Sequence, residues 1–495
     1  MAKRKSTSAP SAPTSAPKPV AKKARFSNPA PPPPQPSTSA SKPRKPSTAA
    51  AAAPPPLNAT PAAPSKFIVS AGSYERLLYG LECSFVPSPS SSSSSKEPYT
   101  LDVNPIFSFP AHLSSLRTVA SSVLATLGTG SERKVGGKYL VSGGTDEVIK
   151  VWDLRRRKEV GVLEGDTIGT ITALRFVPAR NMLLAASSDS TVSLYRVRDW
   201  VLLRGLKGHK GRVNSVDAHP DGRVALSVGA DRMLRMWDLV AGKSVTALKL
   251  GVEGDIVRWN TNGSKFVVIC NNNLTVYGLD MTTHHALSSP SRFHDAHFCY
   301  FPLDTSDPSQ REYLFVACED GKVRVFDVTE PNPVFAAEEE VEEVESMEPV
   351  AVLSGHKNRV KMMDLLEVAL PPSPSSPSSP SSTVVLTTVS SDGRIHLYDL
   401  SRLPSPSSPS SSSSSAKEIE PSASFDTDKT RLTCVCAVGM AERGGKKGGK
   451  EGEEDGEESS DEEEEEDEEE EEDEEEFEGI EEGEGEEVVE EEEEE

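Results

Sequence analysis

The 495 residues carry a formal net charge of −25 at pH 7, but this charge is confined to the two ends of the chain. Residues 451–495 contain 34 acidic and no basic residues, residues 1–65 contain ten basic and no acidic residues, and the remainder is nearly neutral. No apolar run approaches the ~18 residues of a membrane-spanning helix, and no apolar segment typical of a secretory signal opens the chain. The six cysteines lack CxxC spacing, so we expect reduced thiols of a cytosolic or nuclear protein rather than a disulfide scaffold or a metal site.

Residues 1–65 are almost entirely Ala, Pro, Ser, Thr and basic residues. Such a composition buries too little apolar surface to offset the entropy of ordering the chain, so this arm is predicted to be disordered. Short basic clusters in a disordered arm are typical of nuclear import signals, although a solubilising arm with no receptor is the alternative. The residues concerned are Lys3, Arg4, Lys5, Lys22, Lys23 and Arg25.

A seven-fold repeat runs through residues 66–440. In each copy a polar turn residue is followed six positions later by an aromatic residue, and a short apolar run ending in small residues precedes it. The seven pairs are Ser73 and Tyr79, Asp146 and Trp152, Asp189 and Tyr195, Asp231 and Trp237, Asn271 and Tyr277, Asp320 and Phe326, and Asp392 and Tyr398. The central copies recur about every 40 to 49 residues.

Each copy is predicted to be a β-hairpin within one blade of a propeller. The apolar run forms a strand that is buried on both faces, the polar residue occupies the tight turn, and the aromatic side chain fills the wedge between neighbouring blades. The period, with four short strands per repeat, is that of the WD-repeat propeller. We therefore expect an all-β, seven-bladed WD-repeat β-propeller between two disordered tails.

The last blade is predicted to be shared by residues 66–110 and 431–440. The Ser73 copy has no innermost strand before it, whereas residues 431–438 form an apolar strand with no hairpin after it. Pairing the two halves would close the ring and leave no exposed sheet edge. Surface inserts, also predicted to be disordered, lie near residues 87–97, 330–350, 371–382 and 403–421.

Two copies carry a set of His, Ser, Asp and an aromatic residue. In WD-repeat proteins such sets form buried hydrogen-bonded tetrads, and their recurrence in register favours a structural role over a catalytic dyad. The two predicted tetrads are His209, Ser227, Asp231 and Trp237, and His356, Ser390, Asp392 and Tyr398. The chain also lacks a phosphate-binding glycine loop, an HExxH motif and a nucleophile elbow. We therefore expect no catalytic residues, no cofactor, no metal ion and no small-molecule substrate.

Basic side chains follow the histidine of both predicted tetrads. These loops occupy equivalent positions in two blades and could present a patch to RNA phosphates or to an acidic protein, although ordinary solvated loop charge is the alternative. The candidate residues are Lys210, Arg212, Lys357, Arg359 and Lys361. A second basic cluster, residues 155–158, is predicted to lie on the opposite rim.

The acidic tail, residues 441–495, is also predicted to be disordered. Ser459 and Ser460 precede a run of carboxylates, which is the context that acidophilic kinases prefer. Long acidic tails bind basic partners such as histones or ribosomal proteins, but the tail could equally improve solubility or shield the basic arm.

Several segments, in matching order and spacing, resemble the family of p21-activated kinase-interacting WD-repeat proteins. They include residues 71–75, 169–176, 209–213, 219–222, 225–229, 257–259, 356–361 and 431–434. Fungal members of this family are assembly factors of the large ribosomal subunit. The resemblance implies a nuclear and nucleolar scaffold for 60S maturation and pre-rRNA processing. Its partners would be pre-ribosomal proteins and pre-rRNA, and it would act as a monomer within a larger complex. Binding to p21-activated kinase is the alternative role, and a histone-binding chromatin propeller is a more distant one.

Overall fold

Strands account for nearly all the regular structure of the computed structural model, which describes residues 63–87, 99–123, 134, 136–163, 169–302, 310–330, 347–371, 382–403 and 416–440. Both predicted tails and most of the predicted inserts lie outside these residues. Two single-turn 3-10 helices, η1 (Pro178–Arg180) and η2 (Leu400–Arg402), interrupt the strands. In this part of the chain, no helix has the length and apolar character needed to cross a membrane.

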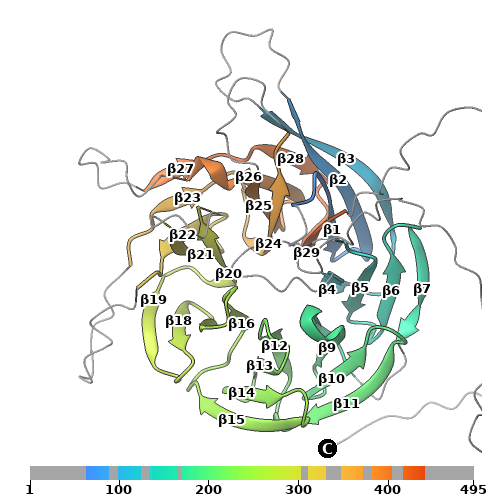
Figure 1. Cartoon of the computed structure of the whole chain (residues 1–495), viewed down its shortest axis with the longest axis vertical. Coiled ribbons are helices and arrows are strands. Elements are labelled where there is room, and N and C mark those ends of the chain that lie inside the picture. Colours follow the sequence, from blue (N-terminus) through green and yellow to red (C-terminus); the bar gives the residue numbers. More distant parts are fainter. Residues whose placement is uncertain are drawn as a thin grey trace, which may run out of the picture. The chain divides into compact units, whose positions relative to one another are not determined.

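The strands form seven sheets around a central channel, so the predicted count of seven blades is confirmed (Figure 1). Blade 1 contains β4 (Leu116–Ser121), β5 (Tyr139–Gly144), β6 (Ile149–Asp153) and β7 (Lys158–Leu163). Blade 2 contains β8 (Ile171–Val177), β9 (Met182–Ser187), β10 (Thr191–Arg196) and β11 (Val201–Lys207). Blade 3 contains β12 (Val213–Ala218), β13 (Val224–Gly229), β14 (Met233–Asp238) and β15 (Lys243–Lys249).

The remaining four blades follow in the same way, with their strands named from the channel outwards. Blade 4 contains β16 (Ile256–Trp259), β17 (Lys265–Cys270), β18 (Asn273–Gly278) and β19 (Thr283–Ser288). Blade 5 contains β20 (Phe293–Phe301), β21 (Arg311–Cys318), β22 (Val323–Asp327), β23 (Ala351–Leu353) and β27 (Lys417–Ile419). Blade 6 contains β24 (Val360–Ala369), β25 (Ser382–Ser390), β26 (Arg394–Asp399) and β28 (Ala423–Asp426). Blade 7 contains β29 (Leu432–Gly439), β1 (Lys66–Ser73), β2 (Leu77–Pro87) and β3 (Tyr99–Pro110).

The hydrophobic core is divided among the seven junctions between neighbouring blades. In the second strand of blade 2, Leu183 and Ala185 pack towards blade 1, whereas Leu184 and Ala186 pack towards blade 3. Successive side chains of a strand point to opposite faces of its sheet, so a strand between two junctions must be apolar at every position. This geometry explains the uninterrupted apolar runs that precede each turn residue.

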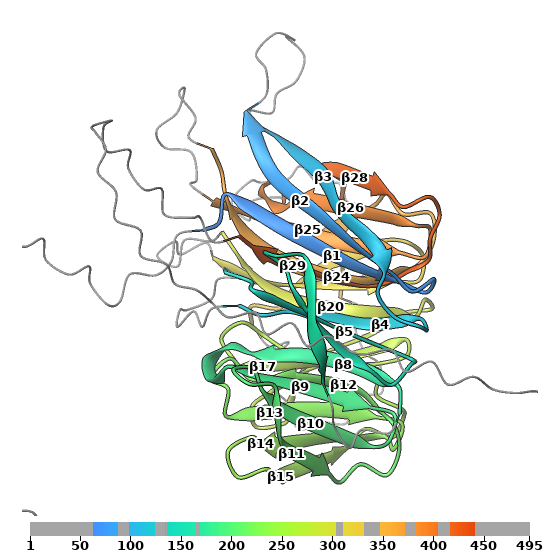
Figure 2. The ribbon, with the colours of Figure 1, turned by 90° about the vertical axis from the view of Figure 1, so that its right-hand side faces the viewer.

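The seventh blade joins the two ends of the propeller. β29 pairs antiparallel with β1, with Phe67 opposite Gly439 and Gly72 opposite Cys434. The outer hairpin of this blade, β2 and β3, is longer than the others and extends beyond the ring (Figures 1 and 2). The first and last strands of the ring are therefore held in one sheet.

One predicted insert is shorter than its composition indicated. We expected disorder over residues 403–421, but β27 lies within this range and adds a fifth, parallel strand to blade 5, with Leu353 opposite Ile419. Ile419 is 4% exposed and belongs to the core between blades 5 and 6. The prediction was wrong here because a single apolar residue beside a serine-rich run gains a buried site and a strand partner from the neighbouring blade.

Candidate functional site

Polar side chains on the innermost strands tie each blade to the next one. The third position of these strands recurs as an acceptor: Thr118 Oγ1 accepts from the Leu174 amide (3.1 Å) and Ser215 Oγ from the Val257 amide (3.4 Å). Three threonine and arginine bonds cross other junctions. Thr172 donates to Val213 O, Thr433 donates to Leu116 O, and Arg258 donates to Asp295. The channel wall is thus held by side chains as well as by packing.

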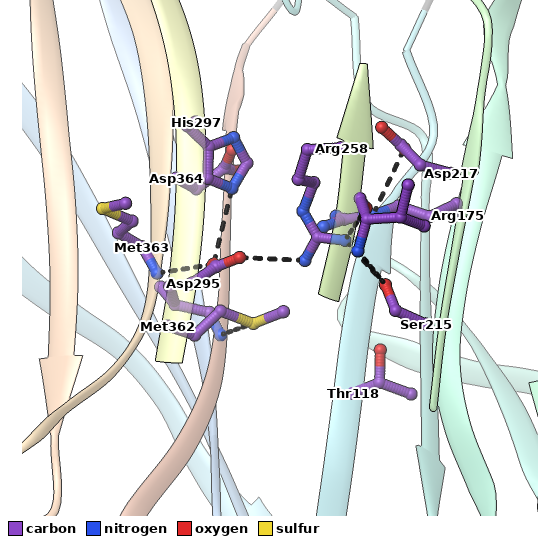
Figure 3. A network of polar contacts seen from close by, with 12 residues as sticks. Thr118, Arg175, Ser215, Asp217, Arg258, Asp295, His297, Met362, Met363 and Asp364 are labelled. Carbon is purple, nitrogen blue, oxygen red and sulfur yellow. Dashed lines mark hydrogen bonds and ion pairs between the residues drawn. The ribbon is translucent and has the colours of Figure 1, made fainter. Parts of the chain in front are cut away.

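A buried ion pair lies at the centre of this network. Arg258 Nη2 is 3.1 Å from Asp295 Oδ1, and the two side chains are 5% and 1% exposed. Figure 3 shows Arg258 pointing towards Asp295, with His297 on the far side of the carboxylate. Burial acts to raise the pKa of Asp295, but the Arg258 guanidinium, together with His297 and Arg175, outweighs it and holds that pKa far below its usual range. Asp295 also accepts from the Met363 amide, so one carboxylate joins blades 4, 5 and 6.

The predicted tetrad in blade 3 has the expected geometry. His209 Nδ1 lies 2.9 Å from Asp231, His209 Nε2 lies 2.7 Å from Ser227 Oγ, and the Trp237 indole donates to the same hydroxyl at 2.7 Å. The two His209 bonds connect the loop before β12 to the hairpin of β13 and β14, and the Trp237 bond lies within that hairpin. Because the Ser227 hydroxyl is engaged by both rings and fully buried, it serves as a structural joint.

The second predicted tetrad needs one correction. His356 bonds to Thr388 Oγ1 at 2.8 Å, whereas Ser390 donates to Asn358 O and the Tyr398 hydroxyl donates to Ser354 O. Thr388 precedes the turn Asp392 by four residues, as Ser227 precedes Asp231, and only that register places a hydroxyl beneath the imidazole. Ser390 is therefore wrong as a tetrad member, while His356 and Asp392 stand 3.2 Å apart as expected. Tyr398 occupies the strand position of Trp237.

Blade 1 contains a third tetrad that sequence reasoning missed. His112 lies 2.8 Å from both Asp146 and Ser142 Oγ, and Trp152 donates to Ser142 at 2.8 Å. The sequence does contain one indication of this tetrad, because Ser142 lies four residues before the turn residue Asp146. It was missed because alanine rather than glycine precedes His112, so the Gly-His pair that marks the other two tetrads is absent.

Acid is expected to destabilise the propeller through its buried histidines. Burial, together with the neighbouring His356, lowers the pKa of His396 from 6.5 to about 4, and burial also lowers that of His209. The unfolded chain then takes up protons at a higher pH than the folded chain. The contribution of these neutral, buried histidines to the stability of the fold is therefore complete above pH 6.5 and is lost as the pH falls towards 4. His396→Gln should flatten the pH dependence of the urea midpoint between about pH 7 and 5, whereas a slope equal to that of the native chain would contradict this role.

The tetrad loops open on one face of the ring, which we call the upper face, where the innermost strands begin. The predicted basic residues separate into two groups there, because blades 3 and 6 lie across the channel from each other (Figure 1). Lys210 and Arg212 belong to blade 3, and Arg212 pairs with Glu253 at 2.7 Å. The structure therefore does not merge the two loops into one patch.

The blade 6 residues instead join basic side chains from blades 5 and 1. Burial, followed by the charges of Arg359 and Arg292, lowers the pKa of Lys361 to about 8, and Arg117 contributes in the same direction. These four cations, Arg117, Arg292, Arg359 and Lys361, are called the mouth cluster below. Arg292 and Arg117 were not predicted, because they follow no tetrad histidine and only ring closure brings them to Lys361.

Carboxylates beside these basic side chains offset part of their charge. Arg292 pairs with Asp255 at 3.0 Å, Arg359 lies 3.7 Å from Glu319, and Glu253 pairs with Arg212 as described above. Within the described residues, Arg117 and Lys361 have no carboxylate at ion-pair distance. The mouth cluster and the exposed Lys357 beside it therefore keep an excess of positive charge at one end of the channel, where an anionic partner is favoured.

The second predicted basic cluster lies on the opposite face. Residues 155–157 occupy the exposed turn between β6 and β7, and Lys158 begins β7. The Asp153 carboxylate accepts from the amides of Arg155 and Arg156. In the part of the chain that the structure describes, no group of three or more His, Cys, Asp or Glu side chains is placed to hold a metal ion. The six cysteines all lie in that part and form no disulfide there.

Comparison with known proteins relates the chain to a group of propellers. The family "WD domain, G-beta repeat" matches residues 103–153, 157–196 and 200–238. A "p21-activated protein kinase-interacting protein 1-like" of Danio rerio is 28% identical over 368 residues, which cover 74% of this chain and 79% of that protein. "Protein MAK11" of Saccharomyces cerevisiae is 29% identical over 364 residues, which cover 68% and 78%. The relative of Gallus gallus is 36% identical over 210 residues, and the chain spans about half (49%) of its length.

Proposed function

Because the chain belongs to the WD-repeat family that includes the p21-activated protein kinase-interacting proteins and Protein MAK11, we propose that it is a non-enzymatic scaffold. Its proposed role is assembly of the large ribosomal subunit, including pre-rRNA processing. It would bind pre-ribosomal proteins and RNA through exposed faces of the ring, and the closed ring would need no second copy to fold.

The observation that carries this proposal is the excess positive charge of the mouth cluster and the neighbouring Lys357 on the upper face. Pre-ribosomal particles are rich in RNA phosphate, and cationic side chains on a rigid surface bind phosphate with a strength that falls steeply with salt. Among the described residues, Tyr74 beside Arg117 is the single largely exposed aromatic side chain at the mouth cluster. One such ring favours contact with the RNA backbone or with an acidic protein over reading of base sequence by stacking.

The opposite charges of the two ends support action in the nucleolus. The basic clusters of residues 3–5 and 22–25 are those proposed to direct nuclear import, and the acidic tail would engage basic ribosomal proteins. Replacing these six basic residues with Ala in a fluorescently tagged chain tests the import proposal. The tagged variant should remain outside the nucleus, and unchanged nuclear accumulation would remove this role from the arm.

Charge reversal on the upper face is expected to release the protein from pre-ribosomal particles. Lys357→Glu with Arg359→Glu changes two exposed side chains, and we expect roughly tenfold weaker co-sedimentation with particles at physiological salt. The matched control is Arg156→Glu with Lys158→Glu, which makes the same change of charge on the lower face. Equal binding by both double variants would contradict the proposed surface.

Depletion of the protein provides the broader test. The assembly role requires a fall in free large subunits and accumulation of unprocessed pre-rRNA, measured by gradient profiling and RNA blotting. Affinity purification of the tagged protein should recover large-subunit precursors. Normal subunit levels after depletion would overturn this role.

A second candidate function comes from what several relatives are called. The human relative is named "p21-activated protein kinase-interacting protein 1", and that of Schizosaccharomyces pombe is named "Shk1 kinase-binding protein 15". By analogy, this chain would bind a p21-activated kinase directly and restrain it. Unchanged ribosomal subunits together with raised kinase activity on depletion would favour this second function.

A further inference from the structure

A hollow of about 530 Å³ lies on the upper face where blades 7 and 1 meet. Tyr74 and Arg76 line it from the turn between β1 and β2, and Leu113 and Arg117 line it from the loop before β4 and the start of that strand. Hydroxyl side chains of Ser114, Ser115 and Thr145 complete the lining. Arg117 belongs also to the mouth cluster, so the hollow and that cluster share one cation.

Two apolar side chains project into solvent at positions that carry polar or small residues in the equivalent loops. Leu113 is 88% exposed and directly follows the tetrad His112, where the other two tetrad loops have Lys210 and Lys357. Ser73, the predicted turn residue, is the last residue of β1, and the 57% exposed Tyr74 begins the turn, two residues before Arg76 with its positive φ. The residues at the same distance before the positive-φ turn residue of five other blades are Thr145, Ser188, Ala230, Glu319 and Ser391.

The loop that presents Leu113 is held in place. The Leu113 amide donates to the tetrad carboxylate of Asp146 at 3.2 Å, and Ser115 bonds to Thr145 at 3.2 Å. An exposed apolar side chain on a fixed loop forms a ready anchor, because little conformational entropy is lost when a partner covers it.

The cations of the hollow lack carboxylate partners within the part of the chain that the structure describes. Arg76 and Arg117 make no ion pair there, whereas Arg212 and Arg292 on the same face are each paired with a carboxylate. A fitting occupant must therefore supply carboxylates together with a large apolar side chain.

We propose that the hollow binds the chain's own acidic tail through residues 473–482, with Phe477 and Ile480 against Tyr74 and Leu113 and the flanking carboxylates against Arg76 and Arg117. Phe477 is the sole aromatic residue of the sequence after position 440, and acidic residues flank it on both sides. The sequence of this segment thus supplies both features that the hollow requires. The contact does not depend on which partner the propeller serves.

The tail is long enough to reach the hollow. β29 ends at Gly439 on the lower face, and Phe477 lies 37 positions after Met440. A flexible chain of that length spans about 35 Å on average and at most about 120 Å, whereas the eight residues of β29 cover only about 27 Å. Tethering then keeps the local concentration of the segment high, so a weak contact suffices for occupancy.

Photo-crosslinking in the full-length chain tests this contact. With p-benzoylphenylalanine in place of Phe477, irradiation should yield crosslinks within one chain to the loops that contain Tyr74 and Leu113. The yield should fall by about fivefold in Leu113→Asp or Arg117→Glu, and also in high salt. Val245→Asp, which changes a 62% exposed side chain on β15, is the matched control and should leave the yield unchanged.

Three outcomes would overturn the proposal. The first is an equal yield at the same loops when the crosslinker replaces Glu468, because the apolar anchor would then be irrelevant. The second is an undiminished yield in Leu113→Asp, with circular dichroism confirming that the variant is folded. The third is crosslinking only between isotopically distinct copies in a mixed sample, which would assign the hollow to a second copy.

Discussion

Removing residues 431–495 is expected to abolish folding of the propeller, whereas removing residues 441–495 should leave it folded. The longer deletion removes β29, whose side chains from Cys434 to Val438 are all at least nine-tenths buried. Burying five such side chains contributes about 7–10 kcal/mol, which is comparable with the whole stability of a typical domain. The deletion also exposes the inner edge of β1 and breaks the bonds from Thr433 to Leu116 and from Ala437 to Asp364.

Far-ultraviolet circular dichroism, limited proteolysis and gel filtration will distinguish the two truncated chains. The chain ending at residue 440 retains the Met440 amide bond to Lys66 O and should unfold at a denaturant midpoint close to that of the full chain. The chain ending at residue 430 should aggregate or be digested rapidly. A cooperative, protease-resistant product from the shorter chain would mean that six blades close without the composite one.

Replacing Asp295 with Ala is expected to destabilise the protein by about 3–5 kcal/mol, because Arg258 would be left charged and unpaired in a buried site. The Met363 amide would lose its acceptor in the same substitution. The loss should appear as a lower urea midpoint with little change in the secondary structure of the native state. A decrease below about 1 kcal/mol would show that water or another group compensates the arginine.

Two further variants separate the contributions of Asp295. Asp295→Asn retains an acceptor for Met363 but removes the charge, so it should still cost most of the stability. Arg258→Met combined with Asp295→Leu removes both charges, and we expect it to recover a large part of the loss, because apolar residues replace a buried pair at little net cost. Failure of the double variant to recover would place the effect in packing rather than in charge.

The proposed functions depend on a rigid ring. The bonds at the junctions hold the seven blades in register, so the upper face presents the mouth cluster and the neighbouring hollow in fixed positions. A surface that is already ordered loses little entropy on binding, which suits a scaffold that must recognise several partners without catalysing a reaction.

Much of the fold could be predicted from local sequence. The spacing from Asp146 to Trp152 and its counterparts arises from one hairpin, whose turn and following strand are close in the chain, so the pattern survives long inserts elsewhere. The blade 3 tetrad was predictable for the same reason. Its three hydrogen bonds connect residues within 22 positions of each other.

The register of blade 6 was less predictable. Ser390 and Thr388 both carry hydroxyls and lie two residues apart, so both point to the same side of β25 and composition alone cannot choose between them. The choice depends on the height of His356 above the sheet, which the turn at Asp392 sets. His112 was overlooked because alanine precedes it, whereas glycine precedes the histidine of the other two tetrads.

The sequence by itself determined the number of blades, the shared seventh blade and the separation of charge between the two ends, because each depends on hairpins or on composition that can be read locally. Only the tertiary structure decided which charges meet. Ring closure brings Arg117 of blade 1 to Lys361 of blade 6, Arg258 to Asp295, and Tyr74 to Leu113. In each case the residues come from different blades. No local sequence pattern indicates which residues of different blades lie close together once the ring has closed.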